Sequence, residues 1–62
     1  MSGIFYDPNT RRLHKVKGAP DPSWALVTHN LDAGVHQCRR ILREFVPLEE
    51  LRSMDWSLAE NR

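Results

Sequence analysis

Residues 31–45 sort into two opposed faces when successive residues are placed about 100° apart, as they are in an α-helix. The apolar face consists of Leu31, Val35, Cys38, Ile41, Leu42 and Phe45. The opposite face is a basic stripe, which we define as His36, Arg39, Arg40 and Arg43. Because an amphipathic helix buries its apolar face, the pattern predicts a main helix over about 31–45 that packs on the rest of the chain.

A second, shorter helix is expected over about 47–56. Pro47 disfavours helical geometry in the residue before it and suits the first position of a new helix. Glu49 and Glu50 then lie in the first turn, where the helix dipole favours acidic residues. The narrow apolar stripe of this helix contains Leu48, Leu51 and Met54.

The N-terminal segment has the pattern of a β-hairpin. Residues 4–6 are aromatic or branched, and residues 7–10 (Asp-Pro-Asn-Thr) favour a turn. The return strand is expected over about 12–17. Because side chains alternate between the two faces of a strand, Leu13 and Val16, three residues apart, cannot share a face without a bulge.

Residues 24–29 fit two interpretations. As a strand, they carry apolar residues on both faces. As a helix, they would begin at Pro22, and Trp24 and Val27 would extend the apolar face of the main helix. We favour the strand, because the residues that follow are weak helix formers and a third strand gives the sheet a viable size. Trp24 is then expected in the core, and the second apolar face must meet the C-terminal helix or another chain.

Together these elements predict an α+β fold, in which the main helix and the short C-terminal helix pack on a small antiparallel sheet. The chain of 62 residues makes a single domain over 1–54, followed by an acidic tail over 55–62 that need not be ordered. A core of this size usually needs support from a disulfide, a metal, a partner or self-association. Cys38 is the one cysteine, so an internal disulfide is impossible.

Charge is distributed unevenly along the chain. Residues 1–43 contain seven basic and three acidic residues, whereas residues 44–62 contain two basic and five acidic ones. A basic body with an acidic tail fits a nucleic-acid surface, and equally a tail that folds back on its own body or onto a second copy. Trp56, in this tail, is either a clamp over the domain's own core or an anchor for a partner.

Catalysis, metal binding and membrane insertion are not expected. No nucleophile lies beside a base and no glycine-rich phosphate loop exists, so we expect no enzyme activity, no cofactor and no small-molecule substrate. His36 and Cys38 lie two residues apart on a helix and point away from each other, so they cannot share a metal ion. No apolar segment is long enough for a membrane span and no signal pattern is present; the expected location is the cytoplasm.

Two functions remain as hypotheses. The first is a non-catalytic protein–protein interaction or accessory module that self-associates or serves a larger protein, with the basic stripe and Trp56 as contacts. The second is a small nucleic-acid binder. In that case the basic stripe acts together with the hairpin residues Arg11, Arg12, Lys15 and Lys17.

The order of hairpin, proline-containing loop, Pro22-x-Trp24, strand and cysteine-containing helix resembles the layout of MbtH-like proteins, which are small partners of adenylation enzymes. The resemblance spans about residues 4–42 and concerns the order of elements. It implies a sheet-plus-helix miniature that acts as an accessory to another protein. The Asn-Asp-Glu and Ser-Leu-Trp-Pro segments of that family are absent, so no residue role is carried over.

Overall fold

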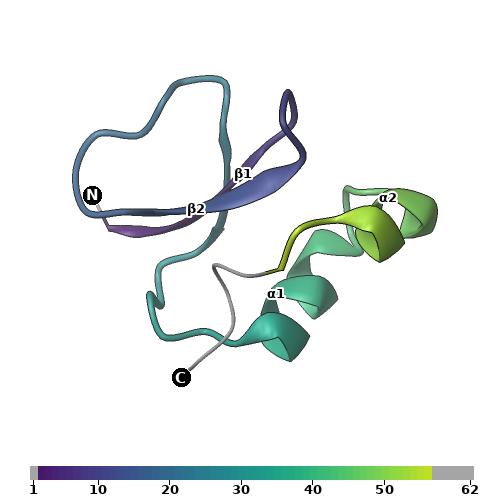
Figure 1. The fold of residues 1–62 in the computed structure, drawn as a ribbon. Helices are drawn as coiled ribbons and strands as arrows, with labels where there is room; N and C mark the ends of the chain where they lie inside the picture. The colour runs from purple at the N-terminus through teal and green to yellow at the C-terminus, as the bar shows by residue number, and fades with distance from the viewer. Residues whose placement is uncertain (1, 57–62) are drawn as a thin grey trace.

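The computed structural model describes residues 2–56 and contains a three-stranded antiparallel sheet followed by two helices (Figure 1). The elements in chain order are β1 (Gly3–Asp7), β2 (Arg12–Val16), β3 (Ala25–Thr28), α1 (Val35–Leu42) and α2 (Leu48–Ser53). The strands lie in the order β2-β1-β3, so β1 is central. This is the predicted α+β fold, and the segment over 24–29 contributes a strand rather than a helix.

Asp7 organises the turn that closes the β1–β2 hairpin. One of its carboxylate oxygens accepts the backbone N–H of Asn9 at 2.9 Å, and the other accepts the Thr10 hydroxyl at 2.9 Å. Arg11 has a φ of 59°, in the left-handed region, and its N–H donates to the Asp7 carbonyl at 2.8 Å. The residues predicted to turn the chain therefore do so, and they set the register of the hairpin.

Side chains alternate between the two faces of the sheet, and the hairpin itself contains no bulge. Leu13 is fully buried toward the helices, whereas Val16 lies on the other face. The irregularity occurs in β3 instead. Its register against β1 shifts between Ile4 and Phe5, which leaves Val27 without an opposite residue. The bulge turns Val27 into the core.

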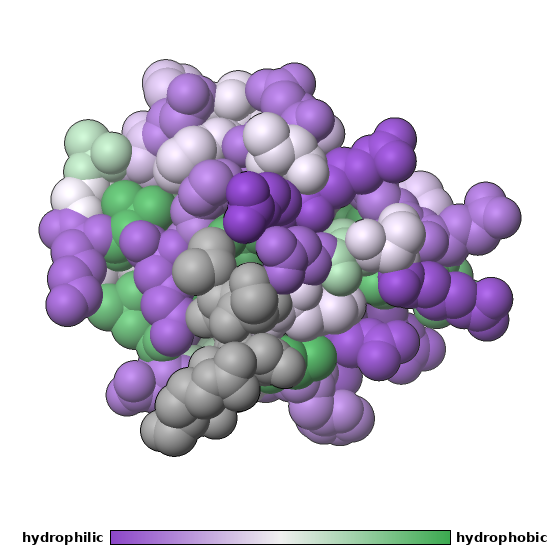
Figure 2. Space-filling model, viewed as in Figure 1, coloured by the Kyte–Doolittle hydropathy of each residue, from purple (hydrophilic) through white to green (hydrophobic). Residues whose placement is uncertain are grey.

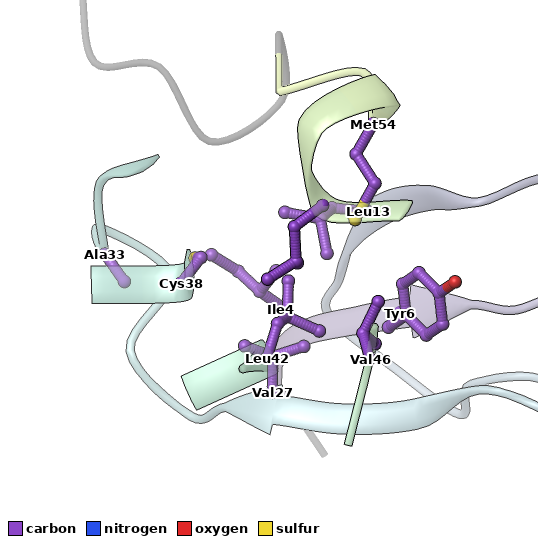
Figure 3. Packing of buried hydrophobic residues seen from close by; sticks show 10 residues of the cluster. Ile4, Tyr6, Leu13, Val27, Ala33, Cys38, Leu42, Val46 and Met54 are labelled. Atoms are coloured by element: carbon purple, nitrogen blue, oxygen red, sulfur yellow. The ribbon is translucent and has the colours of Figure 1, made fainter. Parts of the chain in front are cut away.

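Both helices pack on the same face of the sheet, and the core lies between them and the strands (Figure 3). α1 contributes Cys38 and Leu42, which are fully buried. Cys38 behaves here as a small apolar residue, and burial raises the pKa of its thiol. The buried cluster is Ile4, Tyr6, Leu13, Val27, Ala33, Cys38, Leu42, Val46, Leu51 and Met54.

The chain's own β2–β3 connection covers the second face of the sheet. β2 and β3 run parallel to each other, so residues 17–24 must cross the sheet, and they arc over the side away from the helices (Figure 1). At the end of this connection Trp24 stacks on His14, with ring centroids 4.1 Å apart and an interplanar angle of 1°. Phe5, which points to this face, is 3% exposed.

Two expectations about this second face were wrong. α2 does not cover it, because Leu51 packs into the same cluster as α1 on the first face. Trp24 lies outside that cluster and is half-buried, since it closes the crossover rather than filling the space between sheet and helices. Leu26, on the edge strand β3, stays partly exposed.

α1 covers Val35–Leu42 rather than the predicted 31–45. A separate turn precedes it, because Asn30 hydrogen-bonds to the following backbone. The side-chain oxygen of Asn30 accepts a hydrogen bond from the Asp32 N–H at 2.9 Å. The backbone carbonyl of Asn30 accepts one from the Ala33 N–H at 3.1 Å. Such local bonds compete with a helix and delay its start.

The last turn of α1 is tightened and the second helix is also short. The N–H groups of Glu44 and Phe45 donate to carbonyls three residues earlier, which ends the regular helix. α2 covers Leu48–Ser53 rather than 47–56, and Met54 after it is extended. Within residues 2–56, neither helix has the length and apolar character needed to cross a membrane.

Candidate partner-binding surface

The basic stripe lies on the outer face of α1. The helix buries Cys38 and Leu42 against the sheet, so residues on its opposite side point to solvent. All four members of the stripe are exposed: His36, Arg39, Arg40 and Arg43. The outward orientation predicted for these side chains is therefore observed.

Two adjoining depressions lie along this face, and together we call them the α1 surface. The Phe45 depression has a volume of about 930 Å³ and is lined by Gly34, His36, Gln37, Arg40, Ile41, Glu44 and Phe45. The Leu48 depression has a volume of about 340 Å³ and is lined by His36, Arg39, Arg40, Arg43 and Leu48. Because His36 and Arg40 line both, they form the boundary between the two depressions.

Two large apolar side chains are exposed on the α1 surface. Phe45 is 48% exposed and Leu48 is 55% exposed. The Phe45 ring is supported edge-on by Tyr6, with centroids 6.3 Å apart and an interplanar angle of 69°. On the face seen in Figure 2, hydrophobic areas are small and bordered by hydrophilic side chains. Single exposed apolar residues are ordinary, but two of them in adjoining depressions that share Arg40 distinguish this surface.

The sequence pattern assigned both of these apolar residues to buried faces, and both assignments were wrong. Phe45 follows the tightened end of α1, where the helical spacing on which the assignment rests no longer holds. Val46 is buried in its place. Leu48 begins α2 just after Pro47, one turn before Leu51 enters the core. Proline at 47 was the available signal that the periodicity breaks here.

The basic residues of the hairpin lie apart from the α1 surface, since none of them lines either depression. Arg11 Nε lies 3.0 Å from a carboxylate oxygen of Glu50, and Arg12 Nη2 lies 3.3 Å from Asp55. These two cations are therefore paired within the chain. The other basic residues proposed for nucleic-acid contact, both exposed, are Lys15 and Lys17.

Within the stripe, Arg39 has an internal partner in Trp56. The guanidinium carbon lies 5.9 Å from the centre of the Trp56 ring, a cation–π distance. The indole N–H donates to the Leu51 carbonyl at 3.2 Å, and the ring packs against the buried cluster. Trp56 therefore packs against the domain's own core and is partly buried there. The remainder of the tail, 57–62, lies outside the described residues.

Arg40 and Arg43 differ from these paired cations. Neither makes an ion pair with any of residues 2–56, and both are exposed. Both line the Leu48 depression together with Leu48. Within residues 2–56, the α1 surface therefore combines arginines that make no ion pair with exposed apolar side chains.

Glu50 joins the hairpin to α2. The Tyr6 hydroxyl donates to one Glu50 oxygen at 2.5 Å, while Arg11 pairs with the other. Burial raises the pKa of Tyr6 to about 12, and the hydrogen bond to Glu50 adds to the effect. Tyr6 and Arg11 are far from Glu50 in the sequence, and no local sequence pattern predicts their contact. The cluster holds α2 in place beside the hairpin.

A carboxylate–imidazole pair lies on the hairpin, where Asp7 Oδ2 is 3.2 Å from His14 Nε2. Burial alone would raise the pKa of Asp7, but hydrogen bonds from Thr10, Asn9 and His14 outweigh it and hold the pKa below its ordinary value. In residues 2–56 no hydroxyl or thiol is hydrogen-bonded to His14, as nucleophilic catalysis would need. The same residues contain no group of three or more His, Cys, Asp or Glu side chains placed to hold a metal ion.

Comparisons of the chain with known protein families, with characterised proteins and with solved structures give no match.

Proposed function

We propose that the chain is a small non-catalytic interaction module that acts as an accessory to another protein and binds it through the α1 surface. The observation that carries the proposal is the juxtaposition of Arg40 and Arg43 with the exposed Phe45 and Leu48. Protein interfaces favour this combination, because aromatic, large apolar and arginine side chains supply most of the binding energy. A cytoplasmic location belongs to the proposal, because a chain with one cysteine cannot form the internal disulfides that small proteins of oxidising compartments commonly use for stability.

Burial of the exposed apolar residues by a partner would contribute free energy to binding. Covering a side chain of this size contributes about 1.5–3 kcal/mol when it passes from full exposure to full burial. Phe45 and Leu48 are about half exposed, so each retains roughly half of that amount for a partner. The neighbouring arginines add directional contacts and orient the approach.

Nucleic acid is the second candidate, and the charge arrangement favours it less. A phosphate backbone is bound by many cations on one surface. Arg11 and Arg12 are paired with Glu50 and Asp55, and the hairpin does not line either depression of the α1 surface.

The test is site-specific crosslinking in the native cell, with a photoreactive amino acid at position 37, because Gln37 is exposed and lines the Phe45 depression, and its replacement leaves both arginines in place. The control carries the same group at position 52, because Arg52 is exposed on α2 and lines neither depression. We expect a defined protein adduct from position 37 and none from position 52. The adduct should disappear when Phe45→Ser is added. A second copy of the chain would appear as an adduct of twice its mass, and would place self-association at this surface.

The proposal also requires binding between the two purified proteins. Reconstitution with the crosslinked partner should depend on Arg40 and Arg43. Adducts of position 37 with nucleic acid alone, or equal adducts from positions 37 and 52, would overturn the proposal.

A further inference from the structure

The two depressions of the α1 surface differ in chemistry and adjoin along His36 and Arg40. We infer that this surface takes an acidic amphipathic helix, with its apolar side chains in the Phe45 depression and its carboxylates in the Leu48 depression. The inference rests on the proposed function and names the chemistry of the partner.

The Phe45 depression extends along the exposed side of α1. Its lining residues run from Gly34, just before the helix, through Gln37 and Ile41 to Phe45, just after it. A helix laid beside α1 would therefore contact the depression along the whole length of α1. A partner helix with apolar residues at matching intervals presents them to Ile41 and Phe45 together.

The Leu48 depression supplies the complementary charge. Three of its five lining residues are arginines, and Arg40 and Arg43 have no acidic partner among residues 2–56. A guanidinium group binds a carboxylate through two parallel hydrogen bonds, which a planar fork provides and an ammonium group does not. Carboxylates on one side of a partner helix could therefore form ion pairs with these arginines.

Glu44 fixes which side of the partner faces which depression. Among residues 2–56 it is the one acidic residue that lines the α1 surface, and it lies on the Phe45 side. A carboxylate brought there would meet a like charge, so the acidic face of the partner is directed to the Leu48 side. A uniformly anionic ligand that covered both depressions would meet Glu44 on the Phe45 side.

The experiment measures binding of a labelled synthetic peptide to the full chain by fluorescence anisotropy. The probe is about 15 residues long, with leucine at every third or fourth position and glutamate along one side of the helix. Two control peptides carry glutamine for every glutamate, or serine for every leucine. Labelled single-stranded DNA is the third control.

We expect the probe to bind more tightly than every control by about tenfold or more, with affinity that falls as salt is raised. The variants Phe45→Ala and Arg40→Ala/Arg43→Ala should each lose about tenfold. The control for Phe45→Ala is Leu26→Ala, which removes a comparably exposed apolar side chain outside the α1 surface. The control for the arginine variant is Arg52→Ala, which removes an exposed arginine outside it. Both controls should bind the probe as the parent does. Circular dichroism and thermal melting establish that each variant is folded.

The inference fails if the glutamine peptide or the DNA binds as well as the probe, or if the double arginine variant binds normally. If the probe peptide does not bind but position 37 gives a protein adduct, the acidic-helix inference is overturned and the proposed function stands. Failure of both measurements overturns both.

Discussion

Alkaline pH should destabilise this fold through Tyr6. Burial raises the pKa of Tyr6 from its ordinary value of 10.0 to about 12, so the native state keeps the phenolic proton over a range in which the unfolded chain loses it. The resulting stabilisation is fully present below about pH 10 and disappears as the pH rises through about 12. Two pKa units correspond to about 3 kcal/mol at 1.36 kcal/mol per unit. That amount is comparable with the whole stability expected of so small a core.

Two assays check this prediction. Tyr6 is the one tyrosine, so the tyrosinate absorbance of the native protein reports its pKa directly. Denaturant unfolding followed by circular dichroism gives the free energy of unfolding as a function of pH, for the parent and for Tyr6→Phe. The variant keeps the ring and loses the hydrogen bond to Glu50, which should cost about 1–3 kcal/mol at neutral pH.

The alkaline loss of stability should be smaller in Tyr6→Phe than in the parent. Cys38 also has a raised pKa and is unchanged in the variant, so the difference between the two proteins isolates Tyr6. A native titration centred near pH 10, or an identical alkaline decline in both proteins, would show that the Tyr6–Glu50 contact is not as described.

Three further predictions concern stability, and each is measured by denaturant unfolding. Leu42→Ala removes a fully buried side chain and should cost about 2–5 kcal/mol, enough to unfold a large fraction of the molecules; a loss below about 1 kcal/mol would contradict the core assignment. Arg12→Ala breaks an exposed ion pair with Asp55 and should cost less than about 1 kcal/mol, which a larger loss would refute. Because the pKa of Asp7 is lowered, its stabilisation is lost as the pH falls below about 4, and Asp7→Asn should lack this acid dependence. Equal acid profiles would argue against the Asp7 network.

The elements of the fold can be predicted from the sequence where local chemistry decides the outcome. The turn after Asp7 follows from Asx and proline preferences, and Pro47 separates the two helices. The basic stripe faces solvent because Cys38 and Leu42 on the same helix face the core. In each case, residues within a few positions of one another contain the information.

Long-range contacts account for what the sequence pattern missed. Trp24 stacks on His14 because the β2–β3 connection crosses the second face of the sheet, and nothing near Trp24 specifies that path. Phe45 fits the apolar spacing of α1 but lies beyond its tightened end.

The candidate surface depends on the same kind of contact. Pairing of Arg11 with Glu50 and of Arg12 with Asp55 joins the two ends of the chain and removes the hairpin from a shared basic surface. Charge counts along the sequence show the imbalance between body and tail. They do not show which arginines remain uncompensated.

If the α1 surface binds a partner helix, an NMR titration of the isotope-labelled chain with the acidic probe peptide should locate the contact. Backbone amide signals of Gln37, Arg40 and Phe45 should shift, while those of Arg11 and Arg12 stay in place. Shifts confined to the hairpin, or no shifts at peptide excess, would show that the α1 surface is not the binding site.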